Sequence, residues 1–306
     1  MKPPVALIAG PTASGKSALA LRLAERTGGA IVNADSAQIY RDLPILSAAP
    51  SAEDRARAEH LLYGVLDGAQ PCSAADWAGM AKAEIEHLHG AGRLPILVGG
   101  TGLYLRTLLD GIAPIPAIDP EIRAKIRGNA VGENLAELMP LDPVAATSLN
   151  PGDTTRIARA LEVVRSTGRT LAAWQNKREG GIGDLIELKP LLLLPPRTWL
   201  SARCDRRFAG MVEHGALREV EALLARKLDP ALPVMRAIGV RELSAYRLSE
   251  LTLDQAMVAG QQATRRYSKR QYTWFSNQPP ANWPRSHDPL EGEAIDHALA
   301  LLGAAG

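Results

Sequence analysis

A glycine-rich segment near the N-terminus has the residue types and spacing of a phosphate-binding loop. Residues 10–17, Gly-Pro-Thr-Ala-Ser-Gly-Lys-Ser, match the pattern G-x-x-x-x-G-K-[ST], between an apolar run at 5–9 and a helical pattern at 18–24. Backbone N–H groups and the helix N-terminus of such a loop form a cradle for anions. Lys16 adds a full positive charge, and the Ser17 hydroxyl suits Mg²⁺. We therefore expect residues 10–17 to bind a diphosphate or triphosphate, with Ser17 as the Mg²⁺ ligand.

Two polar residues follow other apolar runs of the sequence. Asp35 comes after residues 30–34, and Thr101 follows residues 94–98 and two glycines. Because the carboxyl ends of parallel strands meet at one edge of a sheet, we expect Asp35 and Thr101 beside the phosphate loop. A cap of the next turn is the alternative role for Asp35. The run 94–98 ends in glycine rather than in the acid that holds Mg²⁺ in ATPases of this class, which disfavours ATP hydrolysis.

Three arginines are concentrated in the second half of the chain. Arg203, Arg206 and Arg207 fall near the start of a helix that we predict over 200–213. Positive charges in the first turns of a helix oppose its dipole, and a nearby anion relieves this conflict. A bound phosphate is the natural candidate for that anion.

Two further segments combine bases with features of a nucleic-acid surface. A helix predicted over 254–274 interleaves bases with aromatic residues between 263 and 275, and bases grip a backbone while aromatic rings stack on nucleobases. Packing of an amphipathic helix explains the same pattern. Arg156 and Arg159 lie three residues apart on a helix that Asp153 can cap. They indicate either a solvated surface or contacts with phosphates.

The order of the predicted elements indicates an α/β protein. Apolar strands at 5–9, 30–34, 94–98 and 191–194 alternate with helices, as in a P-loop NTPase-like parallel sheet core. Prolines at 114, 116 and 120 begin a helix-rich stretch, and the glycines at 180–183 end it. We expect a core formed by residues 1–114 and 184–306, with a helical insertion domain at 115–183 that carries Arg156 and Arg159.

The composition of the sequence limits the cellular compartment and the kinds of partner that we expect. The 306 residues are 46% hydrophobic and carry a net charge of only +2, so any RNA surface must be a local patch. Cys72 and Cys204 lack metal-ligand spacing, which favours a reducing compartment over a disulfide framework. No targeting signal opens the sequence, and no apolar run approaches the ~20 residues of a membrane helix. We expect a cytoplasmic monomer without a membrane partner.

Several segments, in this order along nearly the whole chain, resemble the tRNA dimethylallyltransferases, also called tRNA isopentenyltransferases. These segments are residues 10–17, 35–40 (Asp-Ser-Ala-Gln-Ile-Tyr), 98–104 (Val-Gly-Gly-Thr-Gly-Leu-Tyr), 156–163 (Arg-Ile-Ala-Arg-Ala-Leu-Glu-Val), 207–208, 236–242 and 269–274 (Lys-Arg-Gln-Tyr-Thr-Trp). The sequence has no C-terminal zinc-finger extension, so the resemblance is to the bacterial type.

The resemblance implies transfer of the dimethylallyl group of dimethylallyl diphosphate to N6 of the adenosine 3′ of the anticodon in tRNA. Residues 10–17 then hold the diphosphate, Mg²⁺ is the cofactor, and Asp35, Thr101 and Arg207 are catalytic, with Asp35 as the base. The residues that it implies for binding the anticodon arm are Asp35, Ser36, Ala37, Gln38, Thr101, Arg123, Thr155, Arg156, Ile157, Ala158, Arg159, Arg236, Arg241, Lys269, Arg270, Gln271, Tyr272, Thr273 and Trp274.

Two other classes of function share part of this pattern. A small-molecule or nucleoside kinase has the phosphate loop and an acid at the sheet edge, but it has no need for the helix that mixes bases and aromatics. An RNA-binding NTPase needs an acid for Mg²⁺ and for the attacking water, which the run 94–98 does not supply.

Overall fold

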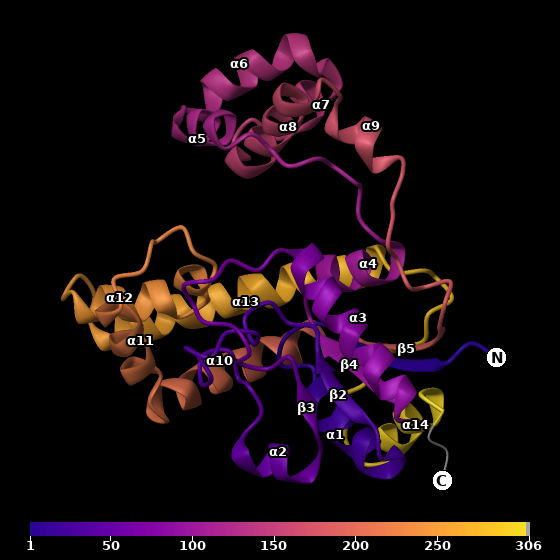
Figure 1. Cartoon of the computed structure of the whole chain (residues 1–306). Helices are drawn as coiled ribbons and strands as arrows, with labels where there is room; N and C mark the ends of the chain where they lie inside the picture. The colour runs from indigo at the N-terminus through magenta and orange to yellow at the C-terminus, as the bar shows by residue number, and fades with distance from the viewer. Residues whose placement is uncertain (304–306) are drawn as a thin grey trace. The chain divides into compact units, whose positions relative to one another are not determined.

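The computed structural model describes residues 1–303, and it has six parallel strands in one sheet of order β3-β2-β4-β1-β5-β6 (Figure 1). The strands are β1 (Pro4–Ala9), β2 (Ala30–Asn33), β3 (His60–Leu61), β4 (Pro95–Gly99), β5 (Glu187–Leu193) and β6 (Arg285–Ser286). The sheet confirms the predicted α/β class. The two-residue strands β3 and β6 are too short to leave a pattern in the sequence.

Two compact units make up the chain. The core unit contains Met1–Leu109 and the chain from Ile182 onward, and the insertion unit is Asp110–Gly181. The boundaries predicted from the sequence are residues 115 and 183. Helices of the core unit are α1 (Lys16–Thr27), α2 (Ala52–Arg57), α3 (Ala74–Gly90), α4 (Gly102–Asp110), α10 (Arg197–Glu213), α11 (Ala216–Ala225), the 3₁₀ helix η1 (Val234–Arg236), α12 (Val240–Arg247), α13 (Leu253–Asn277) and α14 (Glu293–Leu301).

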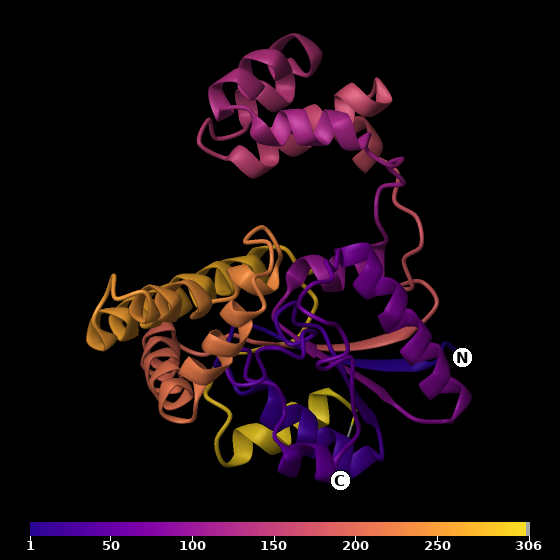
Figure 2. The same cartoon turned by 60° about the vertical axis from the view of Figure 1, so that its left-hand side comes forward.

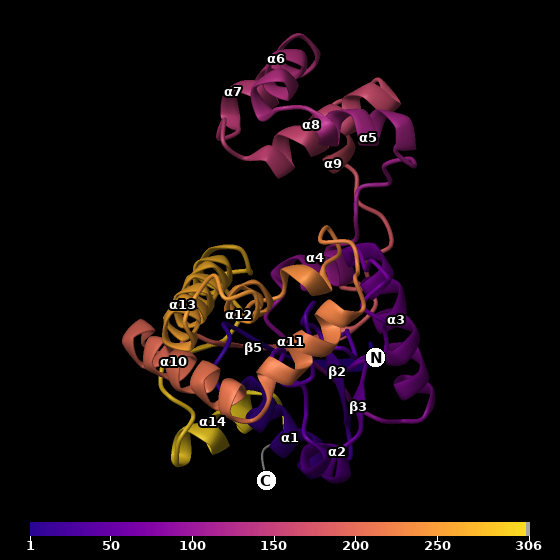
Figure 3. The ribbon, with the colours of Figure 1, turned by 90° about the vertical axis from the view of Figure 1, so that its left-hand side faces the viewer.

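Successive side chains of each strand point to opposite faces of the sheet, and apolar side chains cover both faces. In β1, Ala6 and Ile8 pack with α1 and α14, whereas Leu7 and Ala9 face the cluster that contains α3 and α4. Figure 3 shows α1 and α14 together on one side of the strands, with α3 on the other. These four side chains of β1 are fully buried, as expected for a central parallel strand with both faces covered.

Helices α10 to α13 form a group beside the sheet, and the orange-to-yellow ribbons of Figure 2 follow it. Helix α13 packs along α10 and α12. A Cβ atom at Gly260 of α13 would lie 2.1 Å from the Phe208 ring of α10, so only glycine allows the two helices to approach this closely. Helix α10 begins at Arg197, which makes Arg203 its seventh residue and places Arg207 in its middle. The predicted conflict of these arginines with the helix dipole is therefore wrong.

The insertion unit is a small helical bundle with its own core. Its helices are α5 (Pro120–Gly128), α6 (Val131–Leu141), α7 (Pro143–Ser148), α8 (Thr154–Thr167) and α9 (Leu171–Gln175). Ile157 and Leu161 of α8 are fully buried among apolar side chains of α5, α6 and α7. The Asp153 carboxylate accepts a hydrogen bond from the Arg156 N–H, which confirms the predicted cap of α8. None of the helices in residues 1–303 has the length and apolar character needed to cross a membrane.

Candidate active site

The phosphate loop connects β1 to α1 in a conformation that its glycines permit. Gly10 has φ 151°, and a Cβ atom there would lie 2.4 Å from the Leu193 carbonyl oxygen of the neighbouring strand β5. Gly15, at the N-terminus of α1, has φ 98°. Both values lie in the region that favours glycine. The first residue of α1 is Lys16, whose ammonium donates a hydrogen bond to the Pro11 carbonyl at 2.6 Å.

Four cations surround this loop. The phosphate pocket is defined here by residues 13–18 of the loop and α1 together with Arg203, Arg206 and Arg207 of α10. Arg203 donates from Nε to the Ala13 carbonyl at 2.9 Å, and Arg207 donates to the Thr12 hydroxyl at 3.3 Å. Desolvation lowers the pKa of Lys16 to about 8 and also lowers the pKa of Arg207, although the nearby Asp35 carboxylate opposes both shifts. An anion bound in this pocket removes the electrostatic repulsion among the four cations.

The loops after β2 and β4 meet next to the phosphate loop, as predicted. The Thr101 N–H donates to the Ala34 carbonyl at 3.2 Å, and the Thr101 hydroxyl accepts from the Ser36 N–H at 3.0 Å. Gly99 makes this approach possible, because a Cβ atom there would lie 2.0 Å from the Ala34 oxygen. Asp35 is partly exposed, and its carboxylate accepts a hydrogen bond from the Ala37 N–H at 3.0 Å. Asp35 thus stabilises the next turn and also presents a carboxylate near Lys16 and Arg207.

A cavity of about 220 Å³ lies against this edge of the sheet, and we call it the rim cavity. Its polar side includes Thr12, Asp35 and Arg207, and its apolar side includes Phe208 and Val234. Thr12 and Arg207 also take part in the phosphate loop and phosphate pocket, so the two spaces adjoin. A site for an anion therefore lies next to a cavity with one carboxylate and an apolar wall, the arrangement needed by a diphosphate that carries an apolar group.

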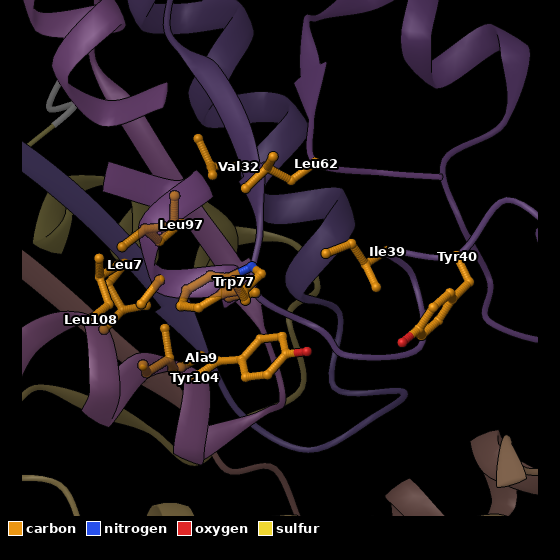
Figure 4. Packing of buried hydrophobic residues seen from close by; sticks show 14 of the residues in the cluster. Leu7, Ala9, Val32, Ile39, Tyr40, Leu62, Trp77, Leu97, Tyr104 and Leu108 are labelled. Carbon is orange, nitrogen blue, oxygen red and sulfur yellow. The ribbon is translucent and has the colours of Figure 1, made fainter. Parts of the chain in front are cut away.

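Aromatic rings build another part of the rim cavity. Tyr104 stacks on Trp77 with ring centroids 4.6 Å apart, and its hydroxyl donates to the Cys72 sulfur at 3.7 Å. The Tyr40 hydroxyl is buried, and burial raises its pKa to about 12. In Figure 4 the hydroxyl groups of Tyr40 and Tyr104 point toward the space between the two rings. This wall is rigid because Trp77 is itself fully buried.

Residues of the 36–38 segment have different surroundings. Ser36 and Ala37 line the rim cavity beside Asp35. Gln38 instead donates from its amide nitrogen to the carbonyls of Ser47 and Ala48, at 3.0 and 2.8 Å. Its amide nitrogen is therefore engaged in holding the loop 47–48, and its side chain faces a different pocket from that of Asp35.

Helix α13 combines buried and exposed residues over 269–274. Gln271 is 5% exposed and hydrogen-bonded to two loops of the active site, so its side chain is not presented at the surface, and its predicted contact with tRNA stays a prediction. Trp274 is half-buried and packs on Gly102, and Tyr272 lies under the Arg197 guanidinium at 4.6 Å. The two rings thus have packing partners. Lys269, Arg270 and Thr273 are exposed and remain available to a partner.

Two arginines predicted to bind tRNA lie on η1 and α12. Arg236 lines the rim cavity and is exposed, and Arg241 is exposed on the first turn of α12. The core unit thus has exposed bases both at the cavity and on neighbouring helices.

In the insertion unit, the predicted tRNA residues separate by burial. Ile157 and Ala158 are 0% and 4% exposed within the apolar core, so their side chains serve packing, and their predicted contact with tRNA stays a prediction. Thr155 and Arg156 are exposed. Arg123 and Arg159 form ion pairs with the fully buried Glu162.

Sequence reasoning missed several residues of these sites. Tyr267 of α13 lines the rim cavity and has a side-chain hydrogen bond with Thr101, and burial raises its pKa. Its spacing of four from Gln271 places both on one helix face, which is the signal that could have revealed it. Arg127 joins Arg123 and Arg159 at Glu162 through a 2.6 Å ion pair. The spacing of four between Arg123 and Arg127 is the corresponding signal there.

The described residues provide few protein ligands for a metal ion at the phosphate loop. No group of three or more His, Cys, Asp or Glu side chains suited to a metal occurs within residues 1–303. Ser17 is exposed at the phosphate pocket. A hydroxyl beside a diphosphate site fits Mg²⁺, which keeps several waters and uses phosphate oxygens as ligands.

Comparisons with known proteins agree with this geometry. The IPP transferase family model matches residues 38–278, and an isopentenyl transferase model matches residues 3–67. Proteins named tRNA dimethylallyltransferase from Sphingopyxis alaskensis and Zymomonas mobilis are 58% and 51% identical to the chain, over 97% and 98% of it and 98% and 97% of their own lengths.

Solved structures give the same assignment. The structure of a full-length tRNA isopentenylpyrophosphate transferase from Bacillus halodurans is 29% identical, with a TM-score of 0.70 over 100% of this chain and 98% of the other. A eukaryotic dimethylallyltransferase acting on tRNA is 27% identical, with a TM-score of 0.77 over 89% of this chain and 70% of its own. The predicted P-loop NTPase-like fold is confirmed, and the chain belongs to the IPP transferase family, that of the tRNA dimethylallyltransferases.

Proposed function

We propose that the chain transfers the dimethylallyl group of dimethylallyl diphosphate to N6 of the adenosine 3′ of the anticodon in tRNA. The bond between C1 of the allyl group and the diphosphate oxygen breaks, and a bond between C1 and N6 forms. Diphosphate leaves, and N6 loses one proton. The single observation that carries this proposal is the adjacency of the four-cation phosphate pocket to a cavity with one carboxylate and an apolar wall.

Asp35 is the base that accepts the proton of N6. The lone pair of the exocyclic amine is delocalised into the adenine ring, so the amine is a weak nucleophile without a nearby acceptor for its proton. A positioned carboxylate supplies that acceptor while the new bond forms. Asp35 supports this role because it lines the rim cavity and its carboxylate lies near Lys16 and Arg207, where the diphosphate ends.

The departing diphosphate gains negative charge on the oxygen that it takes from C1. Lys16, Arg207 and the N–H groups of the loop are aimed at that charge before the reaction begins, which is the most effective form of electrostatic stabilisation. Thr101 contributes by holding the Ser36 N–H and by orienting Tyr267. The flipped adenine must enter the rim cavity, because N6 is not accessible while the base is stacked.

Ser17 would hold Mg²⁺ together with the diphosphate. Bound Mg²⁺ adds positive charge to the oxygens of the leaving group. The remaining part of the site is made by the chain itself, through the loop amides and the four cations of the phosphate pocket.

The anticodon arm would bind exposed bases of the core unit, namely Arg236 at the rim cavity, Arg241 on α12, and Lys269 and Arg270 on α13. Exposed bases of the insertion unit would add contacts, and local bases of this kind let a chain with a net charge of +2 bind RNA. We place the reaction in the cytoplasm, where tRNA and its modifying enzymes meet. Two free cysteines, Cys72 and Cys204, are consistent with that reducing environment.

The test is mass spectrometry of tRNA nucleosides after incubation with dimethylallyl diphosphate, Mg²⁺ and unmodified tRNA. We expect one adenosine per tRNA to gain the mass of a dimethylallyl group. A parallel incubation with ATP distinguishes a kinase, which would release ADP and leave the adenosine unmodified. Absence of the modified nucleoside with active, folded protein contradicts the proposal.

A further inference from the structure

One buried side chain of α13 connects two loops of the active site. The Gln271 amide oxygen accepts a hydrogen bond from the Thr12 N–H at 2.8 Å, and its amide nitrogen donates to the Gly100 carbonyl at 2.8 Å. Thr12 lies in the loop after β1, and Gly100 lies in the loop after β4, the neighbouring strand. Since one partner only donates and the other only accepts, the orientation of the amide is determined by them.

We propose that Gln271 is a positioning residue, which holds the phosphate loop and the loop of Thr101 in the mutual arrangement required for transfer. This inference rests on the proposed function of the site. Gln271 itself is 5% exposed and touches neither the phosphate pocket nor the rim cavity, so it acts through the residues that it holds.

The hydrogen bond to Thr12 decides which groups of the loop face the diphosphate. Because the Thr12 N–H is committed to α13, Thr12 offers its hydroxyl rather than its amide to the site, and Arg207 contacts that hydroxyl at 3.3 Å. Gln271 therefore sets the position of Thr12 and, through it, the position of the Arg207 guanidinium. A donor moved by about 1 Å can cost about 100-fold in rate, although the donor itself is still present.

The hydrogen bond to Gly100 acts in the same way on the second loop. A Cβ atom at Gly100 would lie 2.2 Å from the Gln271 amide nitrogen, so the two groups are in direct contact with no room for a side chain. The next residue, Thr101, accepts a hydrogen bond from the Ser36 N–H beside Asp35. One amide thus fixes the loop that carries diphosphate ligands relative to the loop that supports the base.

The proposal is tested with Gln271→Met, which keeps the volume of the side chain and removes both hydrogen bonds. We expect kcat to fall about 100-fold and the affinity for inorganic diphosphate to fall about 10-fold, because the loop groups are misplaced. The Kd for tRNA should stay within about two-fold, because a buried side chain does not touch RNA. Gln262→Met is the matched control, since Gln262 is exposed on the same helix, and it should resemble the wild type.

A second variant disrupts the hydrogen bond between Gln271 and Gly100 by a substitution at Gly100. Gly100→Ala displaces the Gln271 amide, so this single variant should also lower kcat and the affinity for diphosphate. In the double variant with Gln271→Met, it should add little to the effect of Gln271→Met. It also tests the proposal if Gln271→Met folds poorly. Wild-type kcat and diphosphate affinity in both variants would overturn the inference, as would weaker tRNA binding with unchanged diphosphate affinity. If the wild type itself bound no diphosphate, the proposed function would be at fault instead.

Discussion

Two clusters of three arginines, one in each unit, differ in how their charge is compensated. In the insertion unit, Arg123, Arg127 and Arg159 gather around Glu162, which is fully buried and lies 2.6 Å from Arg127 and 3.8–3.9 Å from the other two. In the core unit, Arg203, Arg206 and Arg207 line the phosphate pocket with Lys16, and no acidic residue is among the described residues that line it.

The difference separates a structural cluster from a binding cluster. A buried carboxylate is costly unless cations pair with it, so Glu162 needs its arginines for the insertion unit to fold. Arg203 and Arg207 of the core cluster contact loop oxygens instead, which orients them without neutralising them. Their charge remains available for an anion. Asp35 is the carboxylate near Arg207, but it lies in the rim cavity, so its predicted role is in the reaction and not in the fold.

The largest effect is expected from Asp35→Asn. The variant keeps an oxygen that can accept the hydrogen bond of the Ala37 N–H, so the turn should survive, whereas the proton acceptor is lost. We predict that kcat falls by about 10²–10⁴, while the Kd for tRNA and the unfolding temperature change little. Single-turnover kinetics and a tRNA binding curve measure this. If Asp35→Asn kept the kcat of the wild type, Asp35 would not be the catalytic carboxylate that we contrast with the structural carboxylate of Glu162.

The next effect is expected from Arg207→Gln. Loss of a charge aimed at the departing diphosphate should lower kcat by about 10²–10³, since the arginine is held by the Thr12 hydroxyl at the boundary of the two pockets. Arg106→Gln, on the exposed face of α4, is the control and should be close to the wild type. Equal kcat values for Arg207→Gln and Arg106→Gln would show that the diphosphate leaving group does not neutralise the charge of the core cluster.

Glu162→Gln should instead cost stability. Without the carboxylate, three arginines face one another around a buried amide, and we expect the insertion unit to lose about 2 kcal/mol, because the arginines are partly exposed and solvent screens them. Hydrogen exchange of α8 measures this loss. Glu137→Gln, which removes an ion pair with Arg165, is the control and should cost below about 1 kcal/mol. Unchanged exchange in α8 would mean that Glu162 is not the anchor of this cluster.

A smaller effect is expected from pH, through Lys16. Its pKa of about 8 in the free protein lies below its ordinary value, so Lys16 loses its proton as the pH rises through 8, and an anion must then bind together with a proton. Affinity for dimethylallyl diphosphate should therefore fall up to about tenfold between pH 8 and pH 9. Isothermal titration across this range checks it. Lys16→Arg, which keeps its charge, should flatten the dependence, and a steep slope in that variant would contradict the assignment.

The smallest effect is expected from Arg156→Gln. Arg156 is 76% exposed and shares only a 3.4 Å ion pair with its helix cap Asp153, so its loss should leave folding intact. If α8 faces the RNA backbone, tRNA affinity should fall a few-fold and the slope of log K against log salt should decrease by about 0.7–0.9. An unchanged salt slope would assign Arg156 to a solvated surface and confine RNA binding to other bases.

The sequence predicted those site residues that local spacing controls. Residues 10–17 form the loop between β1 and α1, and the strand ends bring Asp35 and Thr101 to one edge, because parallel strands align their carboxyl ends. The cap of α8 at Asp153 is confirmed for the same reason, since a cap acts within one turn.

The sequence did not reveal burial that depends on partners far away in the chain. Gln271 stands among bases and aromatics, and only the packing of α13 against the loops 171 and 259 residues away shows that it is buried. Ile157 and Ala158 are a second case, because the motif around them mixes exposed arginines with core residues. The start of α10 at Arg197 was missed because Pro196 precedes it and no side chain caps it.

By itself, the sequence determined the phosphate loop, the α/β class and the family, since these depend on local patterns and on motif order. Tertiary structure decided what the arginines do. Compensation of charge is a property of distance and burial, and it separates Arg127 at the buried Glu162 from Arg207 at the phosphate pocket. Residue type and spacing alone are the same for a cation that stabilises the fold and for one that is held ready for a ligand.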